Sequence, residues 1–192
     1  MPSLRPRGFT LIEMLIALAV AGILLALAGP NFREAIDANR LTSTANELTA
    51  ALQLARAEAI RQNRRVVLCR TEDGSSCSAA SSTWPGWILF ADTDANGVRG
   101  AAEPVIKSGV FDASLLVKSS PNISALAERI NFRGDGLARA ADNQTLLAGT
   151  LAVCVAAPKP ADNVRDVSLA SGSRTRVGRR NGAGACGVPA DS

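Results

Sequence analysis

The chain has 192 residues, a formal net charge of +4 and no histidine or tyrosine. The lack of histidine excludes a Ser-His-Asp triad, a histidine metal site and a histidine general base. With two Trp and five Phe, the chain has too few aromatic rings for a platform that stacks single-stranded nucleic acid. No Gly-x-Ser-x-Gly motif and no carboxylate pair at a catalytic spacing occurs, so we expect neither an enzyme nor a cofactor.

The first predicted element is an apolar segment from Met14 to Ala28, which follows directly on Glu13. A carboxylate is costly inside hydrocarbon unless a cation neutralises it, so Glu13 needs a positive partner. A secretory signal peptide that is cut after Ala28 is one alternative, and an unprocessed membrane anchor is another. Neither alternative gives Glu13 a role.

The string Arg-Gly-Phe-Thr-Leu-Ile-Glu at residues 7–13 resembles the type III signal of type IV pilins and pseudopilins. The resemblance implies that a prepilin peptidase cuts after Gly8 and that the new N-terminal residue, Phe9, is N-methylated. It also implies that Glu13 pairs with the N-terminal amine of a neighbouring subunit in a filament. Residues 1–8 are then a leader peptide. Residues 9–30 form an inner-membrane and filament-core helix, long enough for a bilayer core of about 30 Å.

An amphipathic helix is predicted over residues 31–64, so that residues 9–64 form one long helix. Pro30 is expected to kink or loosen the helix where the two halves meet. Apolar residues recur at alternating spacings of three and four and lie on one stripe of the helix. The stripe consists of Leu41, Ala45, Leu48, Leu52, Ala55 and Ala59.

Residues 65–192 are predicted to form an antiparallel β domain, because short apolar runs alternate there with clusters of Gly, Pro, Asn, Asp and Ser. The fold class is therefore α+β, with the amphipathic half of the long helix packed on the β domain. The predicted strands cover residues 66–69, 87–90, 104–106, 115–117, 129–132, 151–155 and 167–169.

Several parts of this domain resemble the GspH/FimT family of minor pseudopilins. They are the string Trp-Pro-Gly-Trp-Ile-Leu-Phe-Ala-Asp at residues 84–92, the following Asn96-Gly97, and Ile-Asn-Phe at residues 130–132. The resemblance covers nearly the whole chain and implies a pilin-like fold. We expect Trp84 and Trp87 to be core or sheet-face residues.

The four cysteines predict disulfides, because an even number in an exported chain is typical of an oxidising compartment. Three pairings are possible. We favour Cys69–Cys77, which closes a short Gly/Ser-rich loop, and Cys154–Cys186, which ties the end of the chain to a core strand.

Asp92, Asp94, Asn96 and Glu103 match the spacing of an EF-hand calcium loop, with Gly97 at the sharp turn. Strands flank this loop on both sides, whereas an EF-hand has helices. Asp, Asn and Gly are also common in hairpin turns, so we interpret the loop as a plain turn. A calcium site is the alternative.

A basic segment near the C-terminus contains four arginines within seven residues, Arg174, Arg176, Arg179 and Arg180. We expect them to lack a compensating acid, because the nearest one is Asp166. If the segment is extended, Arg174 and Arg176 point the same way. It resembles the Gly-Arg-x-Arg motif with which FimT-type minor pilins bind DNA, but Ser173 stands in place of the glycine. The alternatives are a solvated loop, or contacts to acidic residues of a neighbouring pilin.

These features predict a minor pilin of a type IV pilus that binds double-stranded DNA without sequence preference during uptake. Its partners are then other pilins, prepilin peptidase, the inner membrane and DNA. The β domain lies first in the periplasm and then on a filament at the cell surface. The alternative is a minor pseudopilin of a type II secretion system, which has no need of a phosphate-binding arginine pair.

Overall fold

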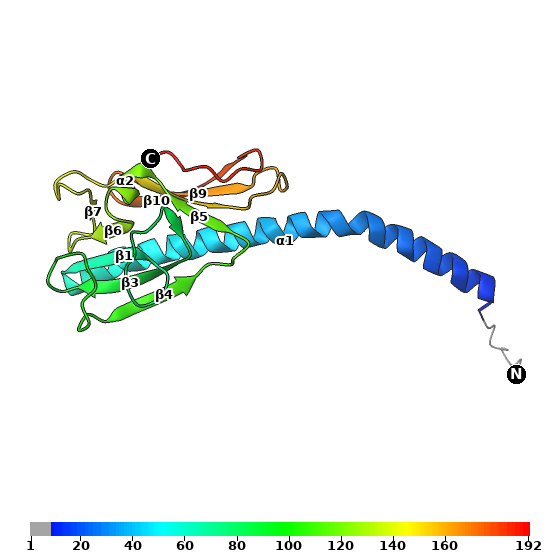
Figure 1. Cartoon of the computed structure of the whole chain (residues 1–192), viewed down its shortest axis with the longest axis horizontal. Helices are drawn as coiled ribbons and strands as arrows, with labels where there is room; N and C mark the ends of the chain where they lie inside the picture. The colour runs from blue at the N-terminus through cyan, green and yellow to red at the C-terminus, as the bar shows by residue number, and fades with distance from the viewer. Residues whose placement is uncertain (1–8) are drawn as a thin grey trace, which may run out of the picture. The chain divides into compact units, whose positions relative to one another are not determined.

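The structure, a computed structural model, describes residues 9–192, apart from the side chains of residues 25–31. The predicted leader, including the proposed cleavage residue Gly8, lies outside the described part. The first element is the helix α1 (Leu11–Gln62), which is helical through Pro30 (Figure 1). The chain forms two compact units, residues 1–36 and 37–192, and α1 contributes to both.

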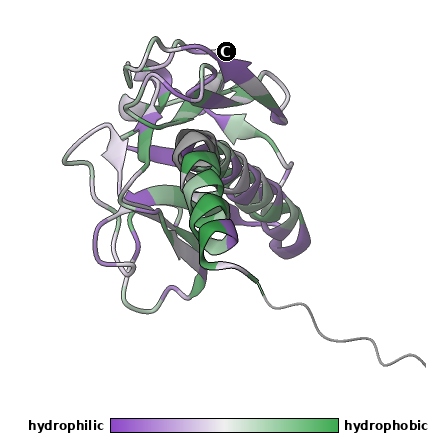
Figure 2. Ribbon diagram, turned by 90° about the vertical axis from the view of Figure 1, so that its right-hand side faces the viewer, coloured by the Kyte–Doolittle hydropathy of each residue, from purple (hydrophilic) through white to green (hydrophobic). Residues whose placement is uncertain are grey.

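In the first unit, the described side chains of α1 are mainly apolar and exposed, and this part of the helix is green in Figure 2. Exposed fractions are 53% for Leu15 and 67% for Leu18, for example. Among the residues whose side chains are described, no helix has an apolar stretch long enough to cross a membrane. The transmembrane segment over residues 9–30 therefore stays a prediction.

The start of α1 carries a capping arrangement. The Thr10 hydroxyl accepts a hydrogen bond from the backbone N–H of Glu13 at 3.3 Å, which satisfies one of the N–H groups that have no partner within the helix. Thr-x-x-Glu is the sequence pattern of a capping box. Sequence analysis missed this local reason for the helix to begin at Leu11.

The second unit contains two antiparallel five-stranded sheets. One sheet has the strand order β4-β3-β1-β6-β7 and the other has the order β10-β9-β8-β5-β2. A single short helix, α2 (Pro121–Ser124), lies between β5 and β6 in the described sequence. The strands are β1 (Arg65–Thr71), β2 (Thr83–Trp84), β3 (Gly86–Asp92), β4 (Val105–Val110), β5 (Leu116–Ser119), β6 (Arg129–Phe132), β7 (Ala138–Arg139), β8 (Gly149–Cys154), β9 (Val164–Ala170) and β10 (Arg174–Arg180).

The main core lies between these sheets and the C-terminal half of α1, which has one sheet on each of two sides (Figure 1). The predicted apolar stripe of the helix is confirmed, because each of its six residues is at most 1% exposed. The stripe packs with residues of both sheets, such as Leu68 of β1 and Leu151 of β8. Burial of these side chains is what fixes the second half of α1 to the sheets.

Both tryptophans are buried in this core, as predicted, with 1% of each residue exposed. The Trp84 indole N–H donates to a carboxylate oxygen of Glu128 at 2.7 Å, and that of Trp87 donates to Glu47 of α1 at 3.0 Å. The indoles therefore bury their rings without leaving an unpaired N–H group.

The seven predicted strands correspond to β1, β3, β4, β5, β6, β8 and β9, with ends that differ by a few residues. Sequence analysis missed β2 and β7, which have two residues each, and the one-turn helix α2. It also left the basic segment without an assigned structure, whereas the structure makes it the seven-residue strand β10. Its composition of Arg, Thr and Gly gave no apolar alternation, because β10 is an edge strand with mostly exposed side chains.

Candidate nucleic-acid interface

The basic segment forms one arm of the β9–β10 hairpin. Its register runs from Arg174 opposite Ala170 to Arg180 opposite Val164. The connecting residues 171–173 include Gly172 and Ser173, which have positive φ angles of 84° and 58°. Ser173 thus adopts a left-handed conformation, which glycine adopts more readily than other residues. The missing glycine does not prevent the turn.

Hydrogen bonds hold Ser173 in this strained conformation. Its hydroxyl accepts a bond from the backbone N–H of Ala138 at 2.7 Å, and its carbonyl accepts one from Arg56 of α1 at 3.1 Å. Ser173 is only 2% exposed. The hairpin tip is therefore anchored to β7 and to the helix, and β10 begins at a fixed point.

Alternate residues of β10 point to opposite faces of its sheet. Thr175 accepts a hydrogen bond from Gln53, so its face is the one turned toward α1. Arg174 and Arg176 are exposed on the other face, pointing the same way as predicted for an extended segment. Arg179 shares the face of Thr175, so the four arginines do not form one surface.

Arg180 is the exception to the prediction that these arginines lack a compensating acid. Its guanidinium makes two hydrogen bonds to the Asp166 carboxylate, at 2.8 and 3.1 Å. These bonds raise the pKa of Arg180 and keep its charge paired. The sequence concealed the pair because Asp166 lies 14 positions earlier, in β9. Arg174, Arg176 and Arg179 make no ion pair with any residue that the structure describes.

A hollow of about 450 Å³ lies beside Arg176 on the face turned away from α1. Its lining includes Ser168 and Asp166 of β9 and Ser192, whose hydroxyl donates to the Leu169 carbonyl at 2.7 Å. The guanidinium of Arg176 thus borders a concave surface, whose lining also includes the apolar residues Ala170 and Val177 and the acidic Asp166.

The predicted assembly residues Phe9 and Glu13 are exposed, and Phe9 has an exposed fraction of 78%. Glu13 lies in the first turn of α1, where the helix dipole favours a negative charge. Both side chains are therefore accessible to a partner at the start of the helix.

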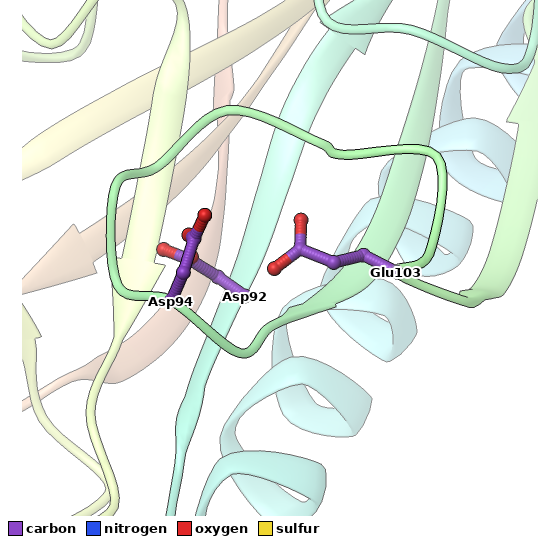
Figure 3. A group of neighbouring side chains, drawn as sticks. All are labelled: Asp92, Asp94 and Glu103. Atoms are coloured by element: carbon purple, nitrogen blue, oxygen red, sulfur yellow. The ribbon is translucent and has the colours of Figure 1, made fainter.

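The acidic loop brings three of its predicted residues together. Carboxylate oxygens of Asp92, Asp94 and Glu103 lie within 4.8 Å of one another, inside the loop that joins β3 to β4 (Figure 3). The two Asp92 oxygens accept N–H bonds from Asn96 and Gly97, at 3.1 and 2.8 Å. Arg65 lies 3.6 Å from the same carboxylate.

Glu103 closes the loop from the opposite side. One of its oxygens accepts the Thr93 N–H at 2.6 Å and the other accepts the Gly100 N–H at 2.8 Å. Burial raises the pKa of Asp92. Burial also pushes the pKa of Glu103 upward, but the bonds from Gly100 and Thr93 outweigh it and hold that pKa below its usual value. The carboxylates act here as acceptors for backbone N–H groups, which is the geometry of a turn.

Both predicted disulfides are present. Cys69–Cys77 closes the loop after β1, and Cys154–Cys186 joins β8 to the C-terminal segment. Cys154 and Cys186 pack with Ala152 and Val164 in a small cluster of their own. The second disulfide therefore fixes the C-terminal segment to the sheet that contains β10.

Two family models match the chain. "Type II transport protein GspH" matches residues 44–173, and "Prokaryotic N-terminal methylation motif" matches residues 4–29. The helix-on-sheets fold and this motif define a pilin-like protein. Because the first match covers more than half of the chain, the chain belongs to the GspH family.

Two relatives are similar to this chain in sequence. The pilin-like protein PilA1 of Thermus thermophilus is 37% identical over 92 residues, which are 47% of this chain and 51% of that protein, so the match spans about half of PilA1. The type IV major alpha-pilin of Moraxella bovis is 32% identical over 123 residues, which are 62% of this chain and 74% of that pilin.

The type IV minor pilin FimU of Pseudomonas aeruginosa has the same fold in two crystal forms. The TM-scores are 0.53 at 24% identity, covering 76% of this chain and 96% of FimU, and 0.50 at 22% identity, covering 74% and 99%. This likeness concerns the fold alone.

Proposed function

We propose that this chain is a minor pilin of a type IV pilus that binds double-stranded DNA for uptake through Arg174 and Arg176. One observation carries the proposal: the two arginines are exposed on the same face of an edge strand, and neither pairs with an acid among the described residues. An unpaired guanidinium next to an anchored hairpin is ready to bind an anion without first breaking an ion pair.

The spacing of the two side chains suits a phosphate backbone. Residues two apart on a strand lie about 7 Å from each other, and each guanidinium forms two parallel hydrogen bonds to a phosphate group. Such contacts read no base, so binding is independent of sequence and weakens as salt rises. The chain has no catalytic role in this proposal.

The test compares the full-length chain in neutral detergent with the variant Arg174→Ala/Arg176→Ala, using a short DNA duplex. The control is Arg64→Ala/Arg133→Ala, which removes two charges from another basic cluster, around a hollow of about 220 Å³. The proposal predicts loss of binding in the first variant only. An equal loss of DNA binding in both variants, or a loss in the control variant alone, would show that the DNA-binding site does not lie on β10.

We further propose that the chain joins a filament after cleavage between Gly8 and Phe9. The free amine of Phe9 then carries a positive charge, and pairing with Glu13 of a neighbouring subunit offsets the cost of burying both groups. The membership in a pilin-like family and the match to the methylation motif support this step. The proposed locations are the inner membrane and periplasm first, and the filament surface later.

Replacement of Glu13 by Ala tests the assembly step. The variant should be made and should fold, because among the side chains that the structure describes the main core begins at Leu41. It should nevertheless be absent from sheared filaments. Normal incorporation of the variant would contradict the role of Glu13.

A minor pseudopilin of a type II secretion system is the second candidate, because the matching family is described by a type II transport protein. Deletion of the gene separates the two functions. Loss of DNA uptake with intact secretion supports the pilus, and the reverse result supports the secretion system.

A further inference from the structure

The β9–β10 hairpin contains a pair of neighbouring arginines whose like charges do not stabilise the fold. Arg165 of β9 and Arg179 of β10 stand directly opposite each other in the strand register. Side chains that face each other across an antiparallel pair are close neighbours, and like charges in such positions destabilise the sheet. Arg179 is exposed, whereas Arg165 is only 5% exposed.

The hydrogen bonds of Arg165 are incomplete. Its Nη1 donates to the backbone carbonyls of Asp162 and Val164, at 2.7 and 3.2 Å. Its Nε–H is buried and has no partner. A buried guanidinium donor without an acceptor is rare and costly, because the group has lost its water without replacing it.

No carboxylate of residues 9–192 with a described side chain forms an ion pair with Arg165 or Arg179. Burial lowers the pKa of Arg165, repulsion from Arg179 lowers it further, and Asp162 offsets this only in part. Arg165 and Arg179 therefore occupy directly opposite positions on the two strands, and neither has an acidic partner among the described side chains.

We infer that Arg165 and Arg179 form a binding site for a phosphate group. A tetrahedral oxyanion offers several acceptors at once, so it can accept hydrogen bonds from the exposed Arg179 and offset the charge of the adjacent, incompletely bonded Arg165. It removes the repulsion between the two guanidinium groups as well. The same chemistry is supplied by free phosphate and by the phosphodiester of a nucleic acid.

That DNA supplies the phosphate group bound at this pair rests on the proposed function. Arg174 and Arg176 lie on one face of β10, and the Arg165–Arg179 pair lies on the other, so the free edge of β10 has arginines on both sides. Arg176 and Arg179 are about 10 Å apart along the strand. A duplex backbone that crosses this edge meets both groups, which makes Arg165 and Arg179 a second contact point.

The first experiment uses inorganic phosphate as the probe and thermal unfolding of the full-length chain in detergent as the readout. Phosphate at about ten times its Kd should raise the unfolding midpoint by about 3–6 °C relative to chloride of equal ionic strength. Arg179→Gln should abolish this increment and should also raise the midpoint in phosphate-free buffer, because it removes the repulsion on Arg165. Arg64→Gln, which changes the same charge elsewhere, should keep the increment. An equal increment in the chain and in Arg179→Gln overturns the inference.

Further comparisons identify which anion binds at this pair and whether DNA supplies it. If acetate stabilises the chain as well as phosphate does, the pair binds carboxylates, such as those of a neighbouring subunit, and the phosphate assignment is wrong. If phosphate binds at this pair but no duplex does, the site stands and the proposed DNA function fails. If Arg174→Ala/Arg176→Ala abolishes duplex binding while Arg179→Gln keeps the full phosphate increment, the DNA function stands and this site fails.

Discussion

The hydroxyl of Ser173 accepts the backbone N–H of Ala138 at 2.7 Å, and this bond joins the β9–β10 hairpin of one sheet to β7 of the other. Both residues are at most 2% exposed, so water does not compete for the bond. The arginines of β10 follow directly after Ser173 in the sequence. The bond therefore determines where the basic strand begins relative to the core.

Replacement of Ser173 should reveal the cost of this anchor. Ser173→Ala keeps the left-handed conformation but leaves the buried Ala138 N–H without a partner, at a cost of about 1–3 kcal/mol in unfolding free energy. Ser173→Gly also loses the bond but avoids the Cβ penalty, so it should be more stable than Ser173→Ala by about 1 kcal/mol. Urea unfolding measures both values. Equal stability of the two variants would show that Ser173 is not strained.

Under the proposed function, removal of the acid that pairs with Arg180 should strengthen the binding of DNA. Asp166→Asn frees the Arg180 guanidinium on the same face as Arg174 and Arg176. We expect affinity to rise about fivefold at low salt and the salt dependence to increase by about one phosphate contact. Asp142→Asn, which makes the same charge change in an exposed loop, is the control. A similar gain in both variants would point to net charge instead of Arg180.

Gly109 of β4 should tolerate no side chain. It lies opposite Trp87, and a Cβ at this position would lie 2.5 Å from the Trp87 Nε1 that donates to Glu47. Gly109→Ala should therefore lower the unfolding free energy by about 1–3 kcal/mol. Gly187→Ala is the matched control, because no atom lies within 4 Å of its added Cβ. An equal decrease of the unfolding free energy in both variants would show that the contact with Trp87 is not the cause.

The acidic loop should make stability depend on pH through Glu103. Because hydrogen bonds hold the folded pKa of Glu103 below its usual value, its contribution is complete above about pH 4.5 and is lost as pH falls through the folded pKa. The raised pKa of Asp92 acts in the opposite direction, since its protonation favours the folded state. Glu103→Gln should cost about 1–3 kcal/mol at pH 7, and less at pH 3, in urea unfolding. An equal cost at both pH values would exclude an ionised Glu103 as the acceptor.

The fold class was predictable because the strongest signals in the sequence are local. The stripe from Leu41 to Ala59 has helical spacing, and the buried strands are apolar runs between turn residues. The edge strand β10 carries no such signal. β10 is exposed, so nothing in its residues required a strand, and only pairing with β9 reveals it.

The candidate interface was predictable only in part. Arg174 and Arg176 follow from an alternation within one strand, which the sequence shows directly. The Arg180–Asp166 and Arg165–Arg179 relationships cross from β10 to β9, so they depend on a register that the sequence does not contain. The left-handed Ser173 was also hidden, because its hydrogen-bond donor lies 35 positions earlier in the chain.

Binding of a DNA duplex to the full-length chain at a series of salt concentrations tests the central claim most directly. We predict that affinity falls steeply with salt and that Arg174→Ala/Arg176→Ala lowers the slope of log Kd against log salt by about 1.8, the value for two lost phosphate contacts. Ser173→Gly, which introduces the glycine of the Gly-Arg-x-Arg motif before Arg174, should retain DNA binding. An unchanged slope and affinity in the double variant would contradict the assignment of β10 as the DNA-binding strand.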